Sequence, residues 1–235
     1  MFFKSIISSN VFLYKIWFNL YLGKKNKSLK LPQSDDVFYF DGFPRSGNSY
    51  TIGLIERAYP ELKNRSAHHL HSIAGIKLAL KKGLKTFIII RQPQDAIVSY
   101  LFVKNSNHSV SSKLISDIID EYITYNEFVY ENRNKINVIK FDDVINNGEK
   151  AILEFGQLFQ LNSNNNVNWI IQDYNSKMKN FQNVQPVKFS SMPNSERKEF
   201  REVNKEGVIN SNNFVKAIDI YNMLSQYNFL NKMRK

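Results

Sequence analysis

The sequence predicts an α/β fold of three layers, in which a central parallel sheet is flanked by helices. Short apolar segments that favour strands alternate along the chain with segments of helical periodicity. The segment KTFIIIR (85–91) is continuously apolar and β-branched, as is typical of the middle of a parallel sheet. The 235 residues, 43% of them hydrophobic, suffice for one substantial domain. We expect residues 31–235 to form that domain and residues 1–30 to form an N-terminal appendage.

The elements follow in order along the chain. Strands are expected at 36–42, 85–91 and 136–141. Helices are expected at 47–58 (ended by Pro60), at 72–83 (ended by Gly83), from Pro93 onward, and at 113–131, 148–160 and 212–226. Connections without regular structure are expected at 65–71, 162–168 and 176–213.

The N-terminal appendage is predicted to be an amphipathic helix that ends near Gly23. Its apolar run, 11–22, is shorter than the roughly 20 residues of a membrane-spanning helix and is broken by Lys15 and Asn19. It also lacks the clean apolar core of a signal peptide. Two interpretations remain open: the helix packs on the domain, or it attaches the protein to a membrane surface with the help of nearby lysines, namely Lys24, Lys25 and Lys27.

The composition restricts the class of partner. The formal net charge is +11, which attracts nucleic acid, acidic membranes, and phosphorylated or sulfated small molecules alike. No recognisable nucleic-acid-binding module is present, so no nucleic-acid partner is expected. The absence of cysteine excludes disulfides, thiolate metal ligands and a cysteine nucleophile.

The segment DGFPRSGNSY (41–50) predicts a P-loop-like phosphate site between a strand and a helix. Glycines at 42 and 47 and a serine at 49 match the pattern G-x-x-x-x-G-K-[ST], but Asn48 replaces the lysine. Arg45 supplies a cation three residues earlier. The free N–H groups and the dipole at a helix start favour an anion. The expected donors to that anion are the backbone and side chains of Arg45, Ser46, Gly47, Asn48 and Ser49.

A second candidate site follows the strand at 85–91. Arg91 lies at the carboxyl end of that strand, where ligands bind in open parallel sheets. Ser99 falls about two turns into the helix that Pro93 opens, so Arg91 and Ser99 are predicted to hold one further phosphate. Asp95 is expected to interact with the free N–H groups of the first helical turn.

These two stretches together, FPRSGNS and IIIRQPQDAIVSY, resemble the sulfotransferases that use 3′-phosphoadenosine-5′-phosphosulfate (PAPS). The resemblance implies that the loop holds the 5′-phosphosulfate and that Arg91 and Ser99 hold the 3′-phosphate. Arg45 corresponds to the cation beside the phosphate–sulfate bridge. Asn48 and Ser49 stand where the family has two small hydroxyl residues. The product would be 3′,5′-adenosine bisphosphate (PAP), no metal would be required, and the acceptor would be a hydroxyl of a small molecule or carbohydrate.

The resemblance also implies a catalytic base. Family members that act on small hydroxyl compounds carry a His-Leu pair between the two phosphate motifs, and His69-Leu70 lies 22 residues before Arg91. His69 is therefore the expected base, and its ordinary pKa near neutrality suits that role. His68 and Glu56 are the alternatives. A metal site built from His68, His69 and His71 is a weaker interpretation, because no acidic ligand has clear spacing with them.

The C-terminal part departs from the family pattern. Many relatives close the 3′-phosphate site with an R-K-G segment. The candidates here are Arg197 with Lys198, or alternatively Lys205 with Gly207.

The sequence therefore predicts a PAPS-dependent sulfotransferase (EC 2.8.2 type), located in the cytoplasm or peripherally on a membrane. Two alternatives remain. One is a P-loop kinase of nucleosides or small molecules, and the other is a non-catalytic protein that binds anions or a membrane surface.

Overall fold

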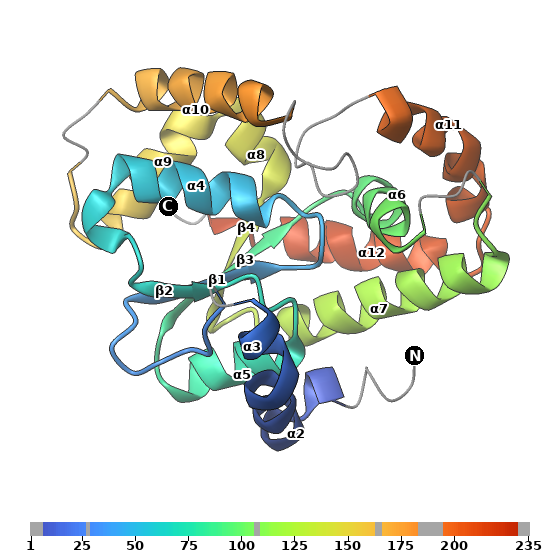
Figure 1. Cartoon of the computed structure of the whole chain (residues 1–235), viewed down its shortest axis with the longest axis horizontal. Coiled ribbons are helices and arrows are strands. Elements are labelled where there is room, and N and C mark those ends of the chain that lie inside the picture. Colours follow the sequence, from blue (N-terminus) through green and yellow to red (C-terminus); the bar gives the residue numbers. More distant parts are fainter. Residues whose placement is uncertain (1–6, 27–28, 106–108, 163–165, 183–194, 230–235) are drawn as a thin grey trace.

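A four-stranded parallel sheet forms the centre of the computed structural model, which describes residues 7–26, 29–105, 109–162, 166–182 and 195–229 (Figure 1). The strand order is β2-β1-β3-β4. The strands are β1 (Phe38–Gly42), β2 (Ser66–His68), β3 (Lys85–Ile90) and β4 (Ile136–Lys140). Helices flank the sheet on both sides, which confirms the predicted three-layer α/β fold with a P-loop-like arrangement.

The order of the strands fixes where a ligand can bind. β1 and β3 are neighbours, with Phe38 beside Lys85 and Gly42 beside Ile89. The chain leaves β1 towards β2 at one edge, and it leaves β3 towards β4 at the other. The carboxyl ends of β1 and β3 therefore lie at a topological switch point, where open α/β sheets bind their ligands. Both predicted phosphate motifs begin at these two ends.

Alternation of side chains along the strands divides the core between the two faces. On one face Phe38, Phe40 and Phe87 are buried under α4 (Asn48–Ala58), α9 (Gly148–Gln157) and α10 (Val167–Gln182). On the other face Tyr39 and Ile88 are buried in a cluster with α5 (Ile73–Lys81), α7 (Ser112–Glu131) and α12 (Phe214–Ser225). Because both faces are covered, the strands are apolar at nearly every position.

Four further elements connect these strands and helices along the chain. They are the 3₁₀ turn η2 (Pro60–Leu62), α6 (Pro93–Lys104), α8 (Phe141–Asn146) and α11 (Ser195–Ile209). Pro93 occupies the first turn of α6, and Gly83, with φ 71°, follows the end of α5, as predicted. α11 packs along α6 and so lies beside the switch point.

Two expectations about irregular segments were wrong. The connection 65–71 contains the short edge strand β2, whose three residues SAH show too little apolar pattern to predict a strand. The segment 176–213 includes the end of α10 and all of α11, while residues 183–194 lie outside the described part of the chain. α11 buries only a narrow seam of side chains, formed by Phe200, Asn204 and Val208, which explains its weak periodicity.

The N-terminal helix consists of α2 (Val11–Trp17), the π-helical turn η1 (Phe18–Leu22) and α3 (Gly23–Lys25), so it ends two residues later than predicted. The Asn10 side chain caps its start by accepting hydrogen bonds from two backbone N–H groups. Tyr14 and Phe18 are buried in the same cluster as α5. The Tyr14 hydroxyl donates to the carbonyl oxygen of Leu70 at 3.4 Å. Among the described residues, no helix combines the length and the apolar character needed to cross a membrane.

We predict that Tyr14→Ala lowers the free energy of unfolding by about 3–5 kcal/mol, because it removes a large side chain from a packed core. Tyr14 is only 1% exposed, whereas Phe12 on the same helix is 71% exposed. Phe12→Ala should therefore change stability by less than about 0.5 kcal/mol. Urea unfolding of both variants measures the difference. Equal changes in the free energy of unfolding in the two variants would mean that residues 1–30 unfold independently of the domain.

Candidate functional site

The turn between β1 and α4 has the backbone of an anion-binding loop. Arg45 and Gly47 both have positive φ, 70° and 99°. Gly47 also lies against the ring of Phe141, and a Cβ atom there would come within 2.2 Å of that ring. Gly47 is the N-cap of α4, and no side chain of the described residues caps the helix start. Because the first N–H groups of a helix have no intrahelical partner, they are free to bind an anion.

The predicted donors in the loop differ in their placement. Ser46 is fully buried, and Asn48 is buried with its Nδ2 atom 3.4 Å from the carbonyl oxygen of Phe43. Ser46 Oγ and Asn48 Oδ1 are buried atoms without a hydrogen-bond partner among the described residues. Ser49, in contrast, is exposed at the start of α4. Of these three side chains, only that of Ser49 is directed to the surface.

The predicted cations converge at the switch point. Arg91 Nη1 donates to the carbonyl oxygen of Arg45 at 3.0 Å, and Arg45 Nε donates to Ser99 Oγ at 3.1 Å. Burial, and after it the positive charges of Arg197 and Arg91, lower the pKa of Arg45 to about 10. Burial also lowers the pKa of Arg91 and of Arg197. Arg45, Arg91, Ser99 and Arg197, hereafter the arginine cluster, thus form one cationic site that favours a bound anion.

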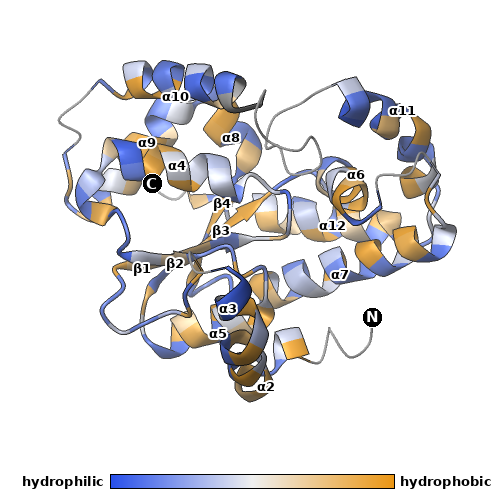
Figure 2. Ribbon diagram, viewed as in Figure 1, coloured by the Kyte–Doolittle hydropathy of each residue, from blue (hydrophilic) through white to orange (hydrophobic). Residues whose placement is uncertain are grey.

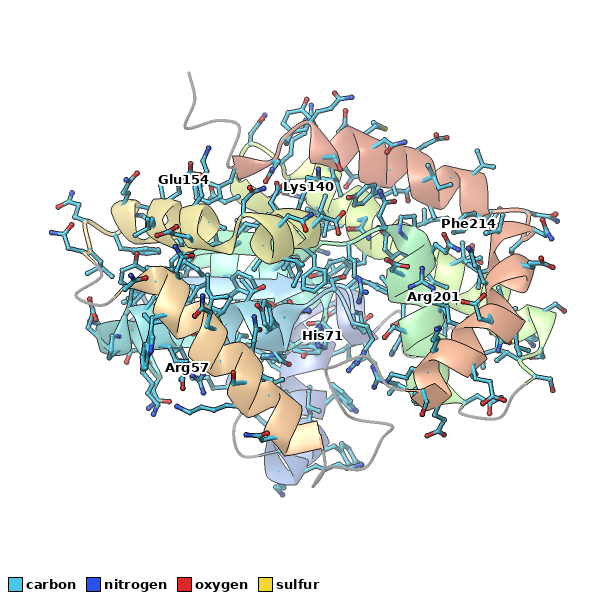
Figure 3. All side chains as sticks on the ribbon, turned by 90° about the horizontal axis from the view of Figure 1, so that it is seen from above. Arg57, His71, Lys140, Glu154, Arg201 and Phe214 are labelled. Atoms are coloured by element: carbon cyan, nitrogen blue, oxygen red, sulfur yellow. The ribbon has the colours of Figure 1, made fainter. Side chains whose placement is uncertain are left out.

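Asp95 joins this cluster to α11. It lies in the first turn of α6, as predicted, and its carboxylate pairs with Arg201 at 2.6 Å and lies 4.0 Å from Arg91. Sequence analysis missed Arg201, although it stands four residues after Arg197 and therefore on the same side of a helix. Figure 3 shows Arg201 and His71 in the view from above.

The other cations proposed for the C-terminal segment are placed differently. Lys198 is exposed on α11 and is not among the charges that lower the pKa of Arg45. Lys205 and Gly207 lie further along the same helix, where a Cβ atom on Gly207 would be 3.3 Å from Ile115 of α7. Both candidate pairs lie on the helix α11.

His69 faces the start of α4. Its Nε2 atom lies 2.9 Å from Ser49 Oγ, and its Nδ1 atom contacts His68 Nδ1. Burial, and after it the neighbouring charges of His71 and His68, lower the pKa of His69 to about 3, so the expectation of a pKa near neutrality for this histidine was wrong. Burial likewise lowers the pKa of His68. Both rings are therefore neutral at pH 7, and in a hydrogen bond between their Nδ1 atoms one donates and the other accepts.

His71 is held by a buried carboxylate that sequence analysis missed. Asp41 is fully buried and accepts hydrogen bonds from the backbone N–H of His71 at 2.8 Å and from the Tyr39 hydroxyl at 2.6 Å. His71 Nδ1 lies 2.8 Å from the carbonyl oxygen of Gly42 and 3.1 Å from Asp41. Although burial lowers the pKa of His71, the Asp41 charge raises it above its ordinary value. The signal in the sequence was a charged residue in an otherwise apolar strand.

Two expectations about the site remain, namely Glu56 as an alternative base and a metal site built from the histidines. Glu56 lies on α4, and its negative charge acts on His68, where it opposes the effect of burial on the pKa. No group of three His, Asp or Glu side chains in the described part of the chain has the arrangement of a metal site.

Three aromatic rings line the start of α4 and were not predicted. Tyr50 stacks on Tyr174 with ring centroids 5.5 Å apart, and it meets Phe141 edge-on at 6.4 Å. The Arg91 guanidinium lies 4.9 Å from the centre of the Phe141 ring. An aromatic cluster thus adjoins both the loop and the arginine cluster.

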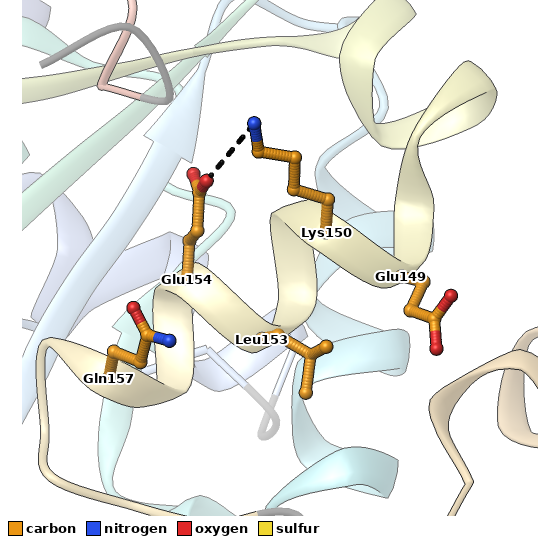
Figure 4. Close-up of a pocket in the computed structure, with 5 residues that line it drawn as sticks. All are labelled: Glu149, Lys150, Leu153, Glu154 and Gln157. Atoms are coloured by element: carbon orange, nitrogen blue, oxygen red, sulfur yellow. Dashed lines mark ion pairs between the residues drawn. The ribbon is translucent and has the colours of Figure 1, made fainter. Parts of the chain in front are cut away.

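A separate surface hollow of about 360 Å³ lies on α9 (Figure 4). Its lining comes entirely from that helix and includes the ion pair between Lys150 and Glu154 at 3.5 Å. None of its lining residues belongs to the loops at the switch point, so we assign it no part in the site.

Comparison with solved structures agrees with this geometry. No protein-family model matches the sequence, and no curated protein is significantly similar to it. The mouse sulfotransferase SULT7A1 complexed with PAP superposes with a TM-score of 0.53, over 85% of this chain and 91% of that chain. The chain has a sulfotransferase-like fold. At 16% identity the similarity is one of fold, and it does not extend to reaction or substrate.

We predict that the histidines of the candidate site have pKa values that lie far apart. His69 should stay neutral down to about pH 3, and His71 should titrate above its ordinary value of 6.5. Between about pH 6.5 and about pH 3, His69 is protonated in the unfolded chain but neutral in the folded one. The contribution of His69 to the free energy of unfolding therefore falls as the pH drops through this range. For His71 the stabilising contribution is complete below pH 6.5 and is lost as the pH rises through its folded-state pKa.

NMR titration of the imidazole protons measures both values. Asp41→Asn should lower the pKa of His71. A His69 ring that titrates near pH 6.5 would contradict the burial on which the prediction rests.

Proposed function

We propose that the protein is a PAPS-dependent sulfotransferase that transfers a sulfuryl group to a hydroxyl of a small-molecule or carbohydrate acceptor. The observation that carries the proposal is that the segment from β1 into α4 meets both the arginine cluster, through Arg45, and a neutral histidine, through the contact of Ser49 with His69. The fold similarity to a PAP-bound sulfotransferase supports it.

The donor set suits a ligand that carries two separate anionic groups. The N–H groups at the start of α4 offer neutral donors for the 5′-phosphosulfate, while Arg91, Arg197 and Ser99 offer charged and hydroxyl donors for the 3′-phosphate. Arg45 lies between these two groups of donors. The ring of Tyr50 offers a stacking surface for the purine.

PAPS, when bound, supplies the sulfuryl group and leaves PAP as the product. In the proposed reaction His69 Nε2 accepts the acceptor proton while the acceptor oxygen bonds to sulfur. The bond between sulfur and the bridging oxygen breaks, and its electron pair stays on the phosphate. Arg45 neutralises that charge, as a preorganised cation does at a site of developing charge. Ser49 Oγ, 2.9 Å from Nε2, marks the space that the acceptor hydroxyl would occupy.

His68 is proposed as a positioning residue. Nε2 of His69 is free to accept a proton only when its Nδ1 carries the hydrogen, and that hydrogen can be donated to His68 Nδ1. The contact between the two Nδ1 atoms serves the base when His68 is the acceptor, and that tautomer is the one we propose.

We predict that Arg91→Ala and Arg197→Ala each weaken the binding of PAP by about 10- to 100-fold, because each removes a charge-assisted hydrogen bond to phosphate. Lys198→Ala is the matched control, since Lys198 is the exposed neighbour of Arg197 on α11. It should change the affinity less than about two-fold. Calorimetry with PAP, with and without Mg²⁺, measures all three variants.

Binding of ATP that requires Mg²⁺, together with no response to PAP, would replace the proposal with a small-molecule kinase. Loss of PAP binding in Lys198→Ala, with Arg197→Ala unaffected, would contradict the assignment of α11 to the site.

We predict that His69→Asn lowers kcat by about 10²- to 10⁴-fold and leaves the affinity for PAP unchanged, because the base acts on the acceptor and not on the nucleotide. Release of PAP from PAPS in the presence of a panel of alcohols, phenols and sugars measures kcat. Glu56→Gln is the control and should retain activity. If Glu56→Gln is inactive and His69→Asn is active, the carboxylate is the base.

A further inference from the structure

The N-terminal helix has two apolar faces, of which the domain covers only one. Tyr14, Phe18 and Leu22 follow one another at intervals of four residues and face the domain, the first two of them buried in its core. Phe12, Ile16 and Leu20 follow at the same interval but start two residues earlier, about 200° around the helix. The second row is exposed, and a monomeric domain gains nothing from it in solution.

The exposed row widens along the helix. Leu13 and Tyr21 flank it, and both are exposed. Phe12 at 71% and Tyr21 at 65% are among the most exposed apolar side chains of the described residues. The π-helical turn η1 adds residues per turn and so keeps Leu20 in line with Ile16. We define Phe12, Leu13, Ile16, Leu20 and Tyr21 as the apolar stripe.

The charges around the apolar stripe have one sign. Six lysines and no acidic residue precede Asp35 in the sequence. Lys15, Lys24 and Lys25 are exposed on the helix itself. Figure 2 shows hydrophobic colour along α2 and hydrophilic colour at α3, where the helix ends in two lysines. Apolar side chains bordered by lysine are typical of helices that lie in the interface of an anionic bilayer.

We propose that the apolar stripe binds the protein to the surface of an anionic lipid membrane, with the helix lying in the plane of the interface. Apolar side chains enter the acyl boundary, and Lys15, Lys24 and Lys25 contact the headgroups. Basic charge complementary to an anionic surface favours this occupant over a second copy of the chain, whose stripe would carry the same lysines. The proposal does not depend on the reaction proposed for the site.

Co-sedimentation of the full-length protein with vesicles tests the proposal. Binding to phosphatidylserine–phosphatidylcholine vesicles should be about ten-fold or more tighter than binding to phosphatidylcholine alone, and it should weaken as salt is added. Phe12→Ser with Leu20→Ser should reduce binding at least about ten-fold. Both side chains are exposed, so the double variant should keep the thermal unfolding of the parent protein.

Two matched controls distinguish binding through the apolar stripe from non-specific apolar adsorption and from attraction by the net charge. Trp169 is 62% exposed on α10, so Trp169→Ser removes an equally exposed aromatic side chain from another surface and should leave vesicle binding unchanged. Lys24→Glu with Lys25→Glu should abolish the preference for phosphatidylserine. Lys63→Glu with Lys113→Glu changes the net charge by the same amount and should preserve most of that preference.

Equal losses in the stripe variant and in Trp169→Ser would overturn the proposal. A second result would also overturn it. In that result the protein does not bind vesicles but sediments as a dimer, and Phe12→Ser dissociates the dimer. In that case a second copy of the chain covers the stripe.

Discussion

The buried carboxylate of Asp41 joins the end of β1 to the segment that carries the histidines. Its exposed fraction is 0%, and it accepts hydrogen bonds from the Tyr39 hydroxyl and from the backbone N–H groups of Gly42 and His71. A buried charge is costly unless its oxygens are satisfied, so few arrangements of these donors are acceptable. β1 ends one residue after Asp41, and the turn to α4 follows. The position of the loop and that of the histidines therefore depend on the same side chain.

Apolar packing between α6 and α11 holds Arg197 in the arginine cluster. Phe102 of α6 and Phe200 of α11 meet with ring centroids 5.2 Å apart, and the Arg197 guanidinium lies 5.2 Å from the centre of the Phe102 ring. This contact keeps Arg197 near Arg91 and Arg45 although their like charges repel. Burial and, after it, this repulsion lower the pKa values of Arg45 and Arg197, and a bound anion would relieve the repulsion. The packing energy of α11 thus maintains a cluster of positive charge that favours a bound anion.

The sequence predicted those parts of the site whose structure depends on residues close together in the chain. Gly47, Arg91 and Ser99 follow recognisable strand-to-helix patterns, so both motifs could be assigned to the correct edge of the sheet. Asp41 and Arg201 could not be assigned, because their partners are distant in the sequence and contact depends on the tertiary fold. β2 was missed for the same reason, since its three residues form a strand only through pairing with β1.

Tyr14 connects the N-terminal helix to the histidine segment. Its hydroxyl bonds to the carbonyl oxygen of Leu70, and His69 and His71, the residues on either side, have left-handed backbones with φ 60° and 47°. Left-handed backbone is unfavourable for such residues and persists only where surrounding contacts impose it. Tyr14 supplies one of those contacts from a helix whose opposite face carries the apolar stripe. On the membrane surface proposed for the stripe, the helix would therefore hold the histidine segment in a fixed orientation towards the lipid.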